Sequence, residues 1–330
     1  MHEALFYEPA GDLLQCWLCP FHCRIAEGDV GHCRVRRNDA GMLVSLNYGE
    51  VTSAHVDPIE KKPLYHFHPG AMILSLGTFG CNLTCGFCQN WQISQQRPQT
   101  QTISPEAAAE LAADMRVSRG NIGIAYTYNE PMIWFEHVLD TARLVRERGM
   151  VNVLVTNGIV EEGPLEELLP VVDAMNVDIK AMDDAFYARN CGGKLASAAR
   201  RTVERAFGRC HVEITNLIIP GENDSDEALV SLFDWAASVS PALPVHLSRY
   251  HPDYQMTNAR TPEATLKRAY DLASQRLQFV YVGNAEIRGT SDTVCPGCGA
   301  TAVERVGFTA RSRTKDGTCP ACGVDLGVVI

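Results

Sequence analysis

The sequence contains no apolar run long enough to span a bilayer, and its first residues, MHEALFYEPAGD, do not resemble a secretory signal. A cytoplasmic protein is therefore expected. The sequence also contains fewer basic than acidic residues, with 29 Lys and Arg and 39 Asp and Glu, which gives a formal net charge of −10. This balance disfavours general binding to nucleic acid or to a membrane surface. Neither a fixed-period repeat nor a low-complexity linker divides the 330 residues, so we expect one large core with a small extra module.

Cysteine, in contrast, is abundant, with thirteen residues, of which eleven fall into three tight groups. In a long chain without a secretory signal, such groups indicate metal binding or redox chemistry rather than disulfides. The groups are Cys16, Cys19, Cys23 and Cys33; Cys81, Cys85 and Cys88; and Cys295, Cys298, Cys319 and Cys322. Each group is therefore a candidate metal site.

Between the outer cysteine groups, strand-like and helix-like segments alternate. Strand patterns occupy 71–77, 121–128, 151–158, 174–181, 211–221, 244–252 and 279–283. Helical patterns lie between them, at 103–115, 132–149, 161–170, 196–208, 225–239 and 262–275. The first has Ser104 as N-cap and Pro105 at the first helical position. Repeated strand–helix units imply a parallel sheet with right-handed crossovers. Six or seven units predict an α/β fold of the partial TIM-type (β/α)6 barrel class.

Three regions follow from this pattern. Residues 1–70 form a Cys-rich segment that leads to the barrel, residues 71–285 form the barrel, and residues 286–330 form a tail that resembles a zinc ribbon. In such barrels the chemistry lies at the carboxyl ends of the strands. Polar segments do follow the strands here, namely the Cys81 group, TYNEP, TNG, DIK, PGEND and RYHP. We therefore expect one site at that end.

The loop GTFGCNLTCGFCQNW supplies three thiols, Cys81, Cys85 and Cys88. A closed tetrahedral metal site takes four protein ligands, and a [4Fe–4S] cluster normally takes four thiolates. Three thiolates therefore indicate a cubane cluster with one iron open to an outside ligand, and the loop glycines let the backbone wrap around it. A zinc site completed by a distant His or Cys is the alternative.

Cys81-x3-Cys85-x2-Cys88, with Phe87 before the third cysteine, resembles the signature loop of the radical S-adenosylmethionine (SAM) superfamily. The resemblance extends over about residues 71–285. It implies a [4Fe–4S] cluster whose open iron chelates the methionine part of SAM, with Phe87 among the cofactor contacts. It also implies reductive release of a 5′-deoxyadenosyl radical and an external one-electron donor such as flavodoxin or ferredoxin.

The resemblance implies further SAM contacts after the next two strands. Asn129 and Glu130 of TYNEP lie where the family binds the SAM amino group, although a helix N-terminus with Glu130 in its first turn would explain them equally. Thr156 and Asn157 of TNG are expected to project from the end of the third strand toward the same opening of the barrel. An ordinary Asn-Gly turn is the alternative.

Two later segments carry similar implications. Asp178 and Lys180 should share one face of a strand. Lys180 would then neutralise the SAM carboxylate, as the Asp-x-Lys pair of pyruvate formate-lyase activating enzymes does; a structural ion pair is the alternative. His251 of RYHP resembles a histidine near that carboxylate in the same subgroup, or is a simple hydrogen-bonded residue.

The outer cysteine groups each offer four thiolates, enough to close a metal site. The C-terminal pair of Cys-x2-Cys knuckles predicts a zinc ribbon or rubredoxin-like site, with mononuclear iron as the alternative. For the N-terminal group zinc is favoured, and an auxiliary iron–sulfur cluster is the alternative. The segment PIEKKPLYHFHPG contributes Lys61, Lys62, His66 and His68, which either meet an anionic substrate at the barrel mouth or form a solvated connection.

Several motifs narrow the resemblance to proteins similar to pyruvate formate-lyase activating enzyme, and within them to the AmmeMemoRadiSam-system radical SAM enzymes. These motifs are the N-terminal cysteine pattern, PIEKKPLYHFHPG and CQNW. No ferredoxin-like insertion follows Cys88. The expected activity is SAM cleavage followed by hydrogen abstraction from an unidentified substrate, a small molecule or a protein. A glycyl-radical enzyme activase, and a non-enzymatic iron–sulfur or zinc scaffold or electron carrier, are the alternatives.

Overall fold

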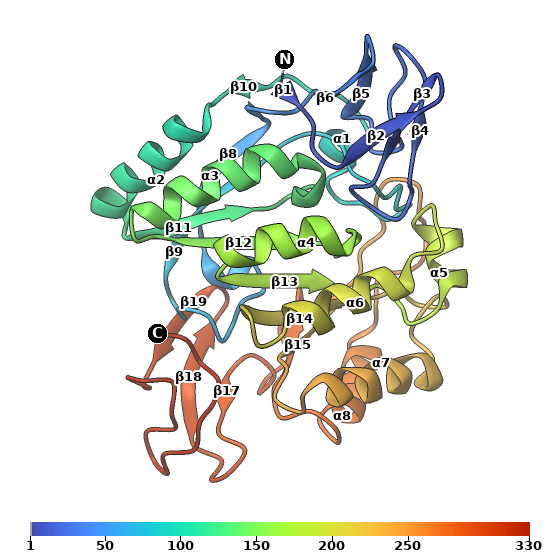
Figure 1. Cartoon of the computed structure of the whole chain (residues 1–330). Helices are drawn as coiled ribbons and strands as arrows, with labels where there is room; N and C mark the ends of the chain where they lie inside the picture. Colours follow the sequence, from blue (N-terminus) through green and yellow to red (C-terminus); the bar gives the residue numbers. More distant parts are fainter. Residues whose placement is uncertain (1) are drawn as a thin grey trace.

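Seven parallel strands and one antiparallel strand form the central sheet of the structure, a computed structural model that describes residues 2–330. The sheet order is β16-β15-β14-β13-β12-β11-β9-β8 (Figure 1). The parallel strands are β9 (Met72–Gly77), β11 (Asn121–Tyr126), β12 (Val151–Thr156), β13 (Ala174–Asp178), β14 (His211–Ile218), β15 (Val245–Arg249) and β16 (Val280–Gly283). Strand β8 (Ser53–Pro58) pairs antiparallel with β9. The predicted α/β class with a parallel sheet is therefore confirmed.

Helices connect successive parallel strands, and α3, α4 and α6 lie in front of the sheet in Figure 1. They are α2 (Pro105–Arg119), α3 (Phe135–Glu147), α4 (Glu162–Leu168), α6 (Ala196–Ala206), α7 (Asp226–Val239) and α8 (Glu263–Ala273). The predicted N-cap of α2 is confirmed, because the Ser104 hydroxyl accepts a 3.2 Å hydrogen bond from the Ala107 N–H. None of the helices within residues 2–330 has both the length and the hydrophobicity needed to cross a bilayer.

Two helical features differ from the sequence expectation. No helix is predicted at 184–190, yet α5 (Asp184–Asn190) forms there, capped by the Asp183 carboxylate, which accepts a 2.8 Å bond from the Phe186 N–H. The helix predicted from residue 132 begins instead as a 3₁₀ turn, η2 (Pro131–Trp134), before α3. The Asp183 cap was the signal in the sequence that could have identified α5.

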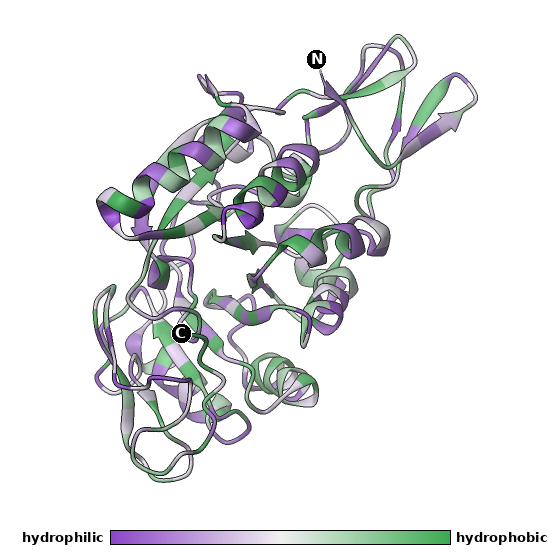
Figure 2. Cartoon of the chain, turned by 60° about the vertical axis from the view of Figure 1, so that its left-hand side comes forward, coloured by the Kyte–Doolittle hydropathy of each residue, from purple (hydrophilic) through white to green (hydrophobic). Residues whose placement is uncertain are grey.

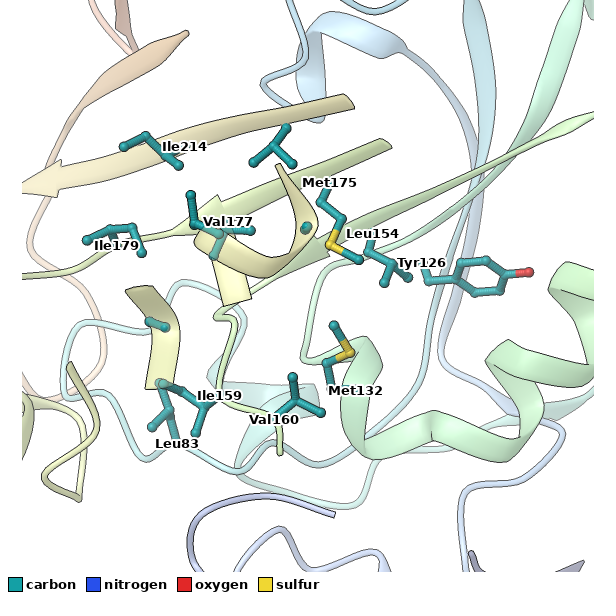
Figure 3. Close-up of a cluster of buried hydrophobic side chains, with 14 of the residues drawn as sticks. Leu83, Tyr126, Met132, Leu154, Ile159, Val160, Met175, Val177, Ile179 and Ile214 are labelled. Carbon is teal, nitrogen blue, oxygen red and sulfur yellow. The ribbon is translucent and has the colours of Figure 1, made fainter. Parts of the chain in front are cut away.

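The core lies between the sheet and its helices, where parallel strands buried on both faces are apolar along their whole length. Figure 3 shows part of it, with Leu154, Val177 and Ile214 from adjacent strands. Leu83 of the three-cysteine loop is only 1% exposed and belongs to the same cluster. The core therefore anchors the loop between its cysteines.

Small sheets flank the central one at opposite ends of the molecule (Figures 1 and 2). The N-terminal strands are β1 (His2–Glu3), β2 (Tyr7–Ala10), β3 (Leu13–Cys16), β4 (Arg24–Ile25), β5 (Arg36–Asp39), β6 (Met42–Ser45) and β7 (Glu50–Val51), which pairs with β10 (Gln101–Thr102). The C-terminal sheet contains β17 (Thr293–Val294), β18 (Thr301–Val306) and β19 (Thr309–Ser312). Three short helices, α1 (Trp91–Ser94), η1 (Ile59–Lys61) and η3 (Leu169–Val171), complete the structure.

Candidate active site

A cavity of about 1010 Å³ lies at the carboxyl ends of the parallel strands. It collects residues that lie far apart in the sequence but follow neighbouring strands. The predicted site residues that line it are Cys81, Cys85, Phe87, Cys88, Asn129, Glu130, Thr156, Asn157, Asp178 and Lys180. His251 follows β15 but is not among the lining residues. One cavity therefore joins every predicted residue of the site except this histidine.

The three-cysteine loop is held by backbone contacts with distant parts of the chain. The N–H groups of Thr84 and Gly86 donate to the carbonyls of Cys191 (2.9 Å) and Asn190 (3.0 Å) at the end of α5. Cys191 is fully buried, and it is not among the residues that line the cavity. The unpredicted helix α5 thus supports the loop from behind.

Polar groups surround the loop sulfurs, of which Cys85 is buried and Cys81 and Cys88 are partly exposed. Cys81 Sγ accepts a 3.3 Å hydrogen bond from the Leu83 N–H and lies 3.8 Å from the side-chain nitrogen of Asn157. Cys88 Sγ and the Ser94 hydroxyl share a 3.1 Å hydrogen bond. Burial raises the pKa of Cys81 above that of a free thiol, whereas the neighbouring Cys191 thiol lowers the pKa of Cys85.

The spacing of these sulfurs fits a cluster better than a single ion. A lone zinc ion bound by thiolates at about 2.3 Å needs sulfurs about 3.8 Å apart. Across residues 2–330, only the C-terminal cysteines bring three or more candidate ligand atoms within 4.8 Å of one another. The loop sulfurs are therefore more widely spread, which suits a polynuclear cluster whose thiolates bind different irons.

Glu130 ties two strand ends together at the floor of the cavity. Its Oε1 accepts hydrogen bonds from the Thr156 hydroxyl (2.6 Å) and the Met132 N–H (2.8 Å), and its Oε2 accepts one from the Asn157 N–H (2.7 Å). Burial raises the pKa of Glu130 to about 7 despite these donors. Glu130 therefore caps the start of η2 and also lines the cavity.

Asp178 and Lys180 form an ion pair of 3.3 Å on the cavity wall. The prediction that both lie on one strand is wrong, because β13 ends at Asp178 and Lys180 follows it. The Lys180 ammonium also lies 5.5 Å from the centre of the Phe87 ring. Burial opposes its charge, but Asp178 and Cys85 raise the pKa of Lys180 above its usual range. A fixed positive charge therefore faces the three-cysteine loop.

A second group of cavity residues comes from outside the parallel strands, namely Asp57 of β8, Lys61, Lys62, Tyr128, Arg119 of α2 and Phe308. Asp57 accepts from Lys62 Nζ (2.9 Å), Lys61 Nζ (3.2 Å) and the Tyr128 hydroxyl (2.8 Å). Tyr128 has a φ of +72°, unusual outside glycine. Strain of this kind persists where surrounding structure fixes a residue, often at a functional site.

Sequence reasoning singled out Lys61 and Lys62 but missed Asp57, Tyr128 and Phe308. Tyr128 belongs to the quoted TYNEP segment, so its position beside Asn129 was an available signal. Phe308 gave none, since it lies at the tip of the β18–β19 hairpin, more than 170 residues further along the chain. It reaches the cavity because the C-terminal sheet packs against the segment that contains Lys61, whose ammonium lies 5.6 Å from the Phe308 ring.

His66 does not reach the cavity mouth, and the alternative of a solvated connection is also wrong for it. It is 1% exposed, with Nε2 hydrogen-bonded to the Tyr281 hydroxyl (2.6 Å) and Nδ1 to the Leu326 carbonyl (2.9 Å). Burial lowers its pKa to about 3. Because Leu326 belongs to the C-terminal tail, His66 fastens that tail to the central sheet.

The C-terminal cysteines form the compact metal-ligand group expected of their spacing. All four sulfurs lie within 4.8 Å of one another, with Cys295–Cys322 at 3.5 Å and Cys298–Cys319 at 3.6 Å. These separations match a single tetrahedral ion, for which about 3.8 Å is ideal. A four-cysteine site is thus present, and its chemistry suits zinc or iron.

Known proteins show related sequences and folds. The family model described as the radical SAM superfamily matches residues 75–233. An uncharacterised protein of Methanocaldococcus jannaschii is 41% identical over 326 residues, which cover 94% of this chain and 93% of the relative. Pyruvate formate-lyase 1-activating enzyme of Escherichia coli strain K12 is 25% identical over 181 residues, or 52% of this chain and 71% of that enzyme.

A solved structure shares the fold at lower identity. The crystal structure of Streptococcus suis SuiB bound to S-adenosylmethionine aligns with a TM-score of 0.52 at 15% identity. The match covers 70% of this chain and 53% of that chain, so this chain spans about half of SuiB.

Proposed function

The chain belongs to the radical SAM superfamily, and we propose that it cleaves SAM reductively at a [4Fe–4S] cluster bound by Cys81, Cys85 and Cys88, giving a 5′-deoxyadenosyl radical that abstracts hydrogen from a substrate. The observation that carries this proposal is the single cavity that joins the three thiols after β9 to polar residues at the ends of β11, β12 and β13. When bound, the cluster would supply one electron to the SAM sulfonium. The family match supports an enzyme rather than a passive scaffold.

The protein's own residues would position SAM around that loop. We propose that Lys180 neutralises the SAM carboxylate, because it is a charged ammonium on the cavity wall facing Phe87. We assign the SAM amino group to the segment of Asn129 and Glu130, because both residues line the cavity beside the three-cysteine loop. Thr156 and Asn157, both held by Glu130, complete this side. His251 would act only if it moved toward the cavity.

The remainder of the cavity is available to a substrate. Its volume of about 1010 Å³ lies at the upper end of the range of about 300–1,000 Å³ that is usual for one small ligand. The wall away from the cysteines carries Lys61, Lys62 and Arg119 against one carboxylate, Asp57. This excess of positive charge favours a substrate, or a substrate segment, that bears an anionic group.

Other parts of the assignment are also proposals. We propose zinc at the C-terminal cysteines, a flavodoxin or ferredoxin as electron donor, a cytoplasmic location, and a partial barrel over residues 71–285 flanked by the segments 1–70 and 286–330. The open order of the sheet, with β16 and β8 at its two edges, supports the partial barrel. Affiliation with the AmmeMemoRadiSam-system enzymes rests on the motifs quoted above.

The second candidate function is activation of a glycyl-radical enzyme, which the similarity to the Escherichia coli activating enzyme favours. Both candidates require SAM cleavage, so 5′-deoxyadenosine formation after anaerobic reconstitution and reduction tests them together. Addition of a formate-lyase-type protein distinguishes the two candidate functions. A glycyl-radical signal in electron paramagnetic resonance (EPR) would support activation, and 5′-deoxyadenosine without that signal would support a different substrate.

A further inference from the structure

The N-terminal cysteines form a group of their own beside the active-site loop. Cys16, Cys19 and Cys33 are each less than 10% exposed, and Cys23 is half-buried. The Cys16 N–H donates to the Cys23 carbonyl (2.9 Å), and the His22 N–H donates to the Cys19 carbonyl (3.1 Å). A Cβ on Gly31, two residues before Cys33, would lie 3.6 Å from Cys23 Sγ, so the four cysteines occupy one region. All four cysteines are free thiols, and four neighbouring free thiols are typical of a metal or iron–sulfur site.

The spacing within this group differs from that of the C-terminal cysteines. The C-terminal sulfurs all lie within 4.8 Å of one another, whereas no three of the N-terminal sulfurs meet that condition. Both groups have four thiols, so ligand number does not account for the difference. A single zinc ion demands the compact arrangement, with sulfurs about 3.8 Å apart. The wider one suits thiolates divided among several irons.

Polar and charged groups surround these sulfurs. The His32 N–H donates to Cys23 Sγ at 3.3 Å. Arg36, 1% exposed, brings a positive charge that acts on Cys16 and Cys33, and it is itself held by Glu136 through bonds of 2.7 and 3.0 Å. Hydrogen bonds and charge near the sulfurs are the features that tune iron–sulfur clusters.

The group also abuts the loop of the first site. Gly80 has a φ of +87°, and a Cβ there would lie 2.8 Å from the Cys33 carbonyl oxygen. The next residue, Arg34, donates from its guanidinium to the carbonyls of Ser94 (2.6 Å) and Cys81 (3.4 Å). The Gly80 backbone therefore packs against the Cys33 carbonyl, and Arg34 connects that segment to Cys81. On the outer side, Trp17 is 39% exposed, so the group reaches the surface.

We propose that Cys16, Cys19, Cys23 and Cys33 bind a second iron–sulfur cluster, placed between the protein surface and the three-cysteine site. From there it would accept one electron from a reduced low-potential carrier and pass that electron to the inner site, and the carrier would be oxidised by one electron. This inference goes beyond the proposed SAM cleavage and does not depend on it, because the N-terminal cysteines bind their metal independently of SAM.

The test uses the full chain with Cys81, Cys85 and Cys88 all changed to Ser. After anaerobic reconstitution with iron and sulfide, iron, sulfide and zinc are counted per chain, and EPR spectra are recorded after dithionite reduction. We expect this variant to lose about four irons per chain relative to wild type, keep the iron of a second cluster, and show a reduced-cluster signal. A chain with two zinc ions and no iron would overturn the proposal.

The converse variant carries Cys16, Cys19, Cys23 and Cys33 changed to Ser, with Cys23→Ser alone as a milder version. Each should keep the inner cluster and lose the second signal, and circular dichroism checks that the chain is folded. In wild type, two reduced clusters this close should couple, so its spectrum should differ from the sum of the two single-site spectra. A folded Cys23→Ser protein with wild-type iron and spectrum would also refute the proposal.

Discussion

The Glu130 carboxylate accepts a 2.6 Å hydrogen bond from the Thr156 hydroxyl, which links the loop after β11 to the end of β12. Its other oxygen accepts a 2.7 Å bond from the Asn157 N–H, and the Asn157 side-chain nitrogen lies 3.8 Å from Cys81 Sγ. One buried carboxylate therefore places two cavity residues, one of which lies next to a proposed cluster ligand.

Changing Glu130→Gln should disrupt this arrangement, because the new NH₂ group cannot accept the bond that one carboxylate oxygen now accepts. The unpaired donor should cost about 1–3 kcal/mol of unfolding free energy. The rate of 5′-deoxyadenosine formation should fall by about tenfold or more. Thr156→Ser keeps the hydroxyl and serves as the control, with activity near wild type. Full activity in Glu130→Gln would show that the carboxylate has no role in the site.

The two lysines beside Asp57 should behave differently when removed. Lys62 is 3% exposed and Lys61 is 45% exposed, yet both bind the same carboxylate. Lys62→Met should lower the unfolding free energy by about 3 kcal/mol, because it removes the buried ammonium that pairs with the Asp57 carboxylate. Lys61→Met should cost less than about 1 kcal/mol. Urea unfolding of both variants provides the comparison, and equal losses would contradict the assigned geometry.

His137 predicts a pH dependence of stability. It is fully buried, stacks on Trp134 at 4.2 Å between ring centres, and neither ring nitrogen has a hydrogen-bond partner within residues 2–330. Burial lowers its pKa to about 3 from 6.5. The folded state therefore binds its proton less readily than the unfolded state, so stability is retained above pH 6.5 and lost as the pH falls toward 3.

His137→Phe should reduce that loss, because phenylalanine keeps the ring packing and cannot be protonated. Thermal unfolding measured from pH 7 to pH 4 should show a shallower decline than in wild type. The variant should also be at least as stable as wild type at pH 7, since two unsatisfied nitrogens are removed. Parallel pH curves for the two proteins would rule out His137 as a source of acid sensitivity.

Removal of the C-terminal metal should loosen the tail without abolishing the first site. Cys295→Ser should lose one metal ion per chain, and limited proteolysis should then cut within residues 286–330. The central sheet should stay folded because its core does not depend on these thiols. Cys210→Ser, outside all three cysteine groups, is the matched control. An unchanged metal content in Cys295→Ser would contradict a four-cysteine site.

The sequence predicts the central architecture well because each strand of a parallel sheet carries its own apolar signal, and because α2 and α7 begin at serine N-caps. The cavity residues were predictable for the same reason, since polar groups that follow neighbouring strands must meet at one edge. Lys180 shows the limit: it reaches the cavity, but from beyond the end of β13 rather than from the strand.

Residues that reach the site through tertiary packing left no local signal. Phe308 depends on how the C-terminal sheet docks, and that docking depends on buried partners such as His66 with Leu326. The helix α5 was missed although the Asp183 cap was available in the sequence. The spacing of the N-terminal sulfurs was also not predictable, since the sequence does not show whether four thiols lie close together or further apart.

Cleavage of SAM by the three-cysteine site is the central claim, and 5′-deoxyadenosine per chain measures it most directly. The protein is reconstituted anaerobically, reduced with dithionite and supplied with SAM, beside a Cys81→Ala variant that keeps its C-terminal metal. We predict 5′-deoxyadenosine from wild type and none above background from Cys81→Ala. A wild-type protein with a reducible cluster that forms no 5′-deoxyadenosine would contradict the account.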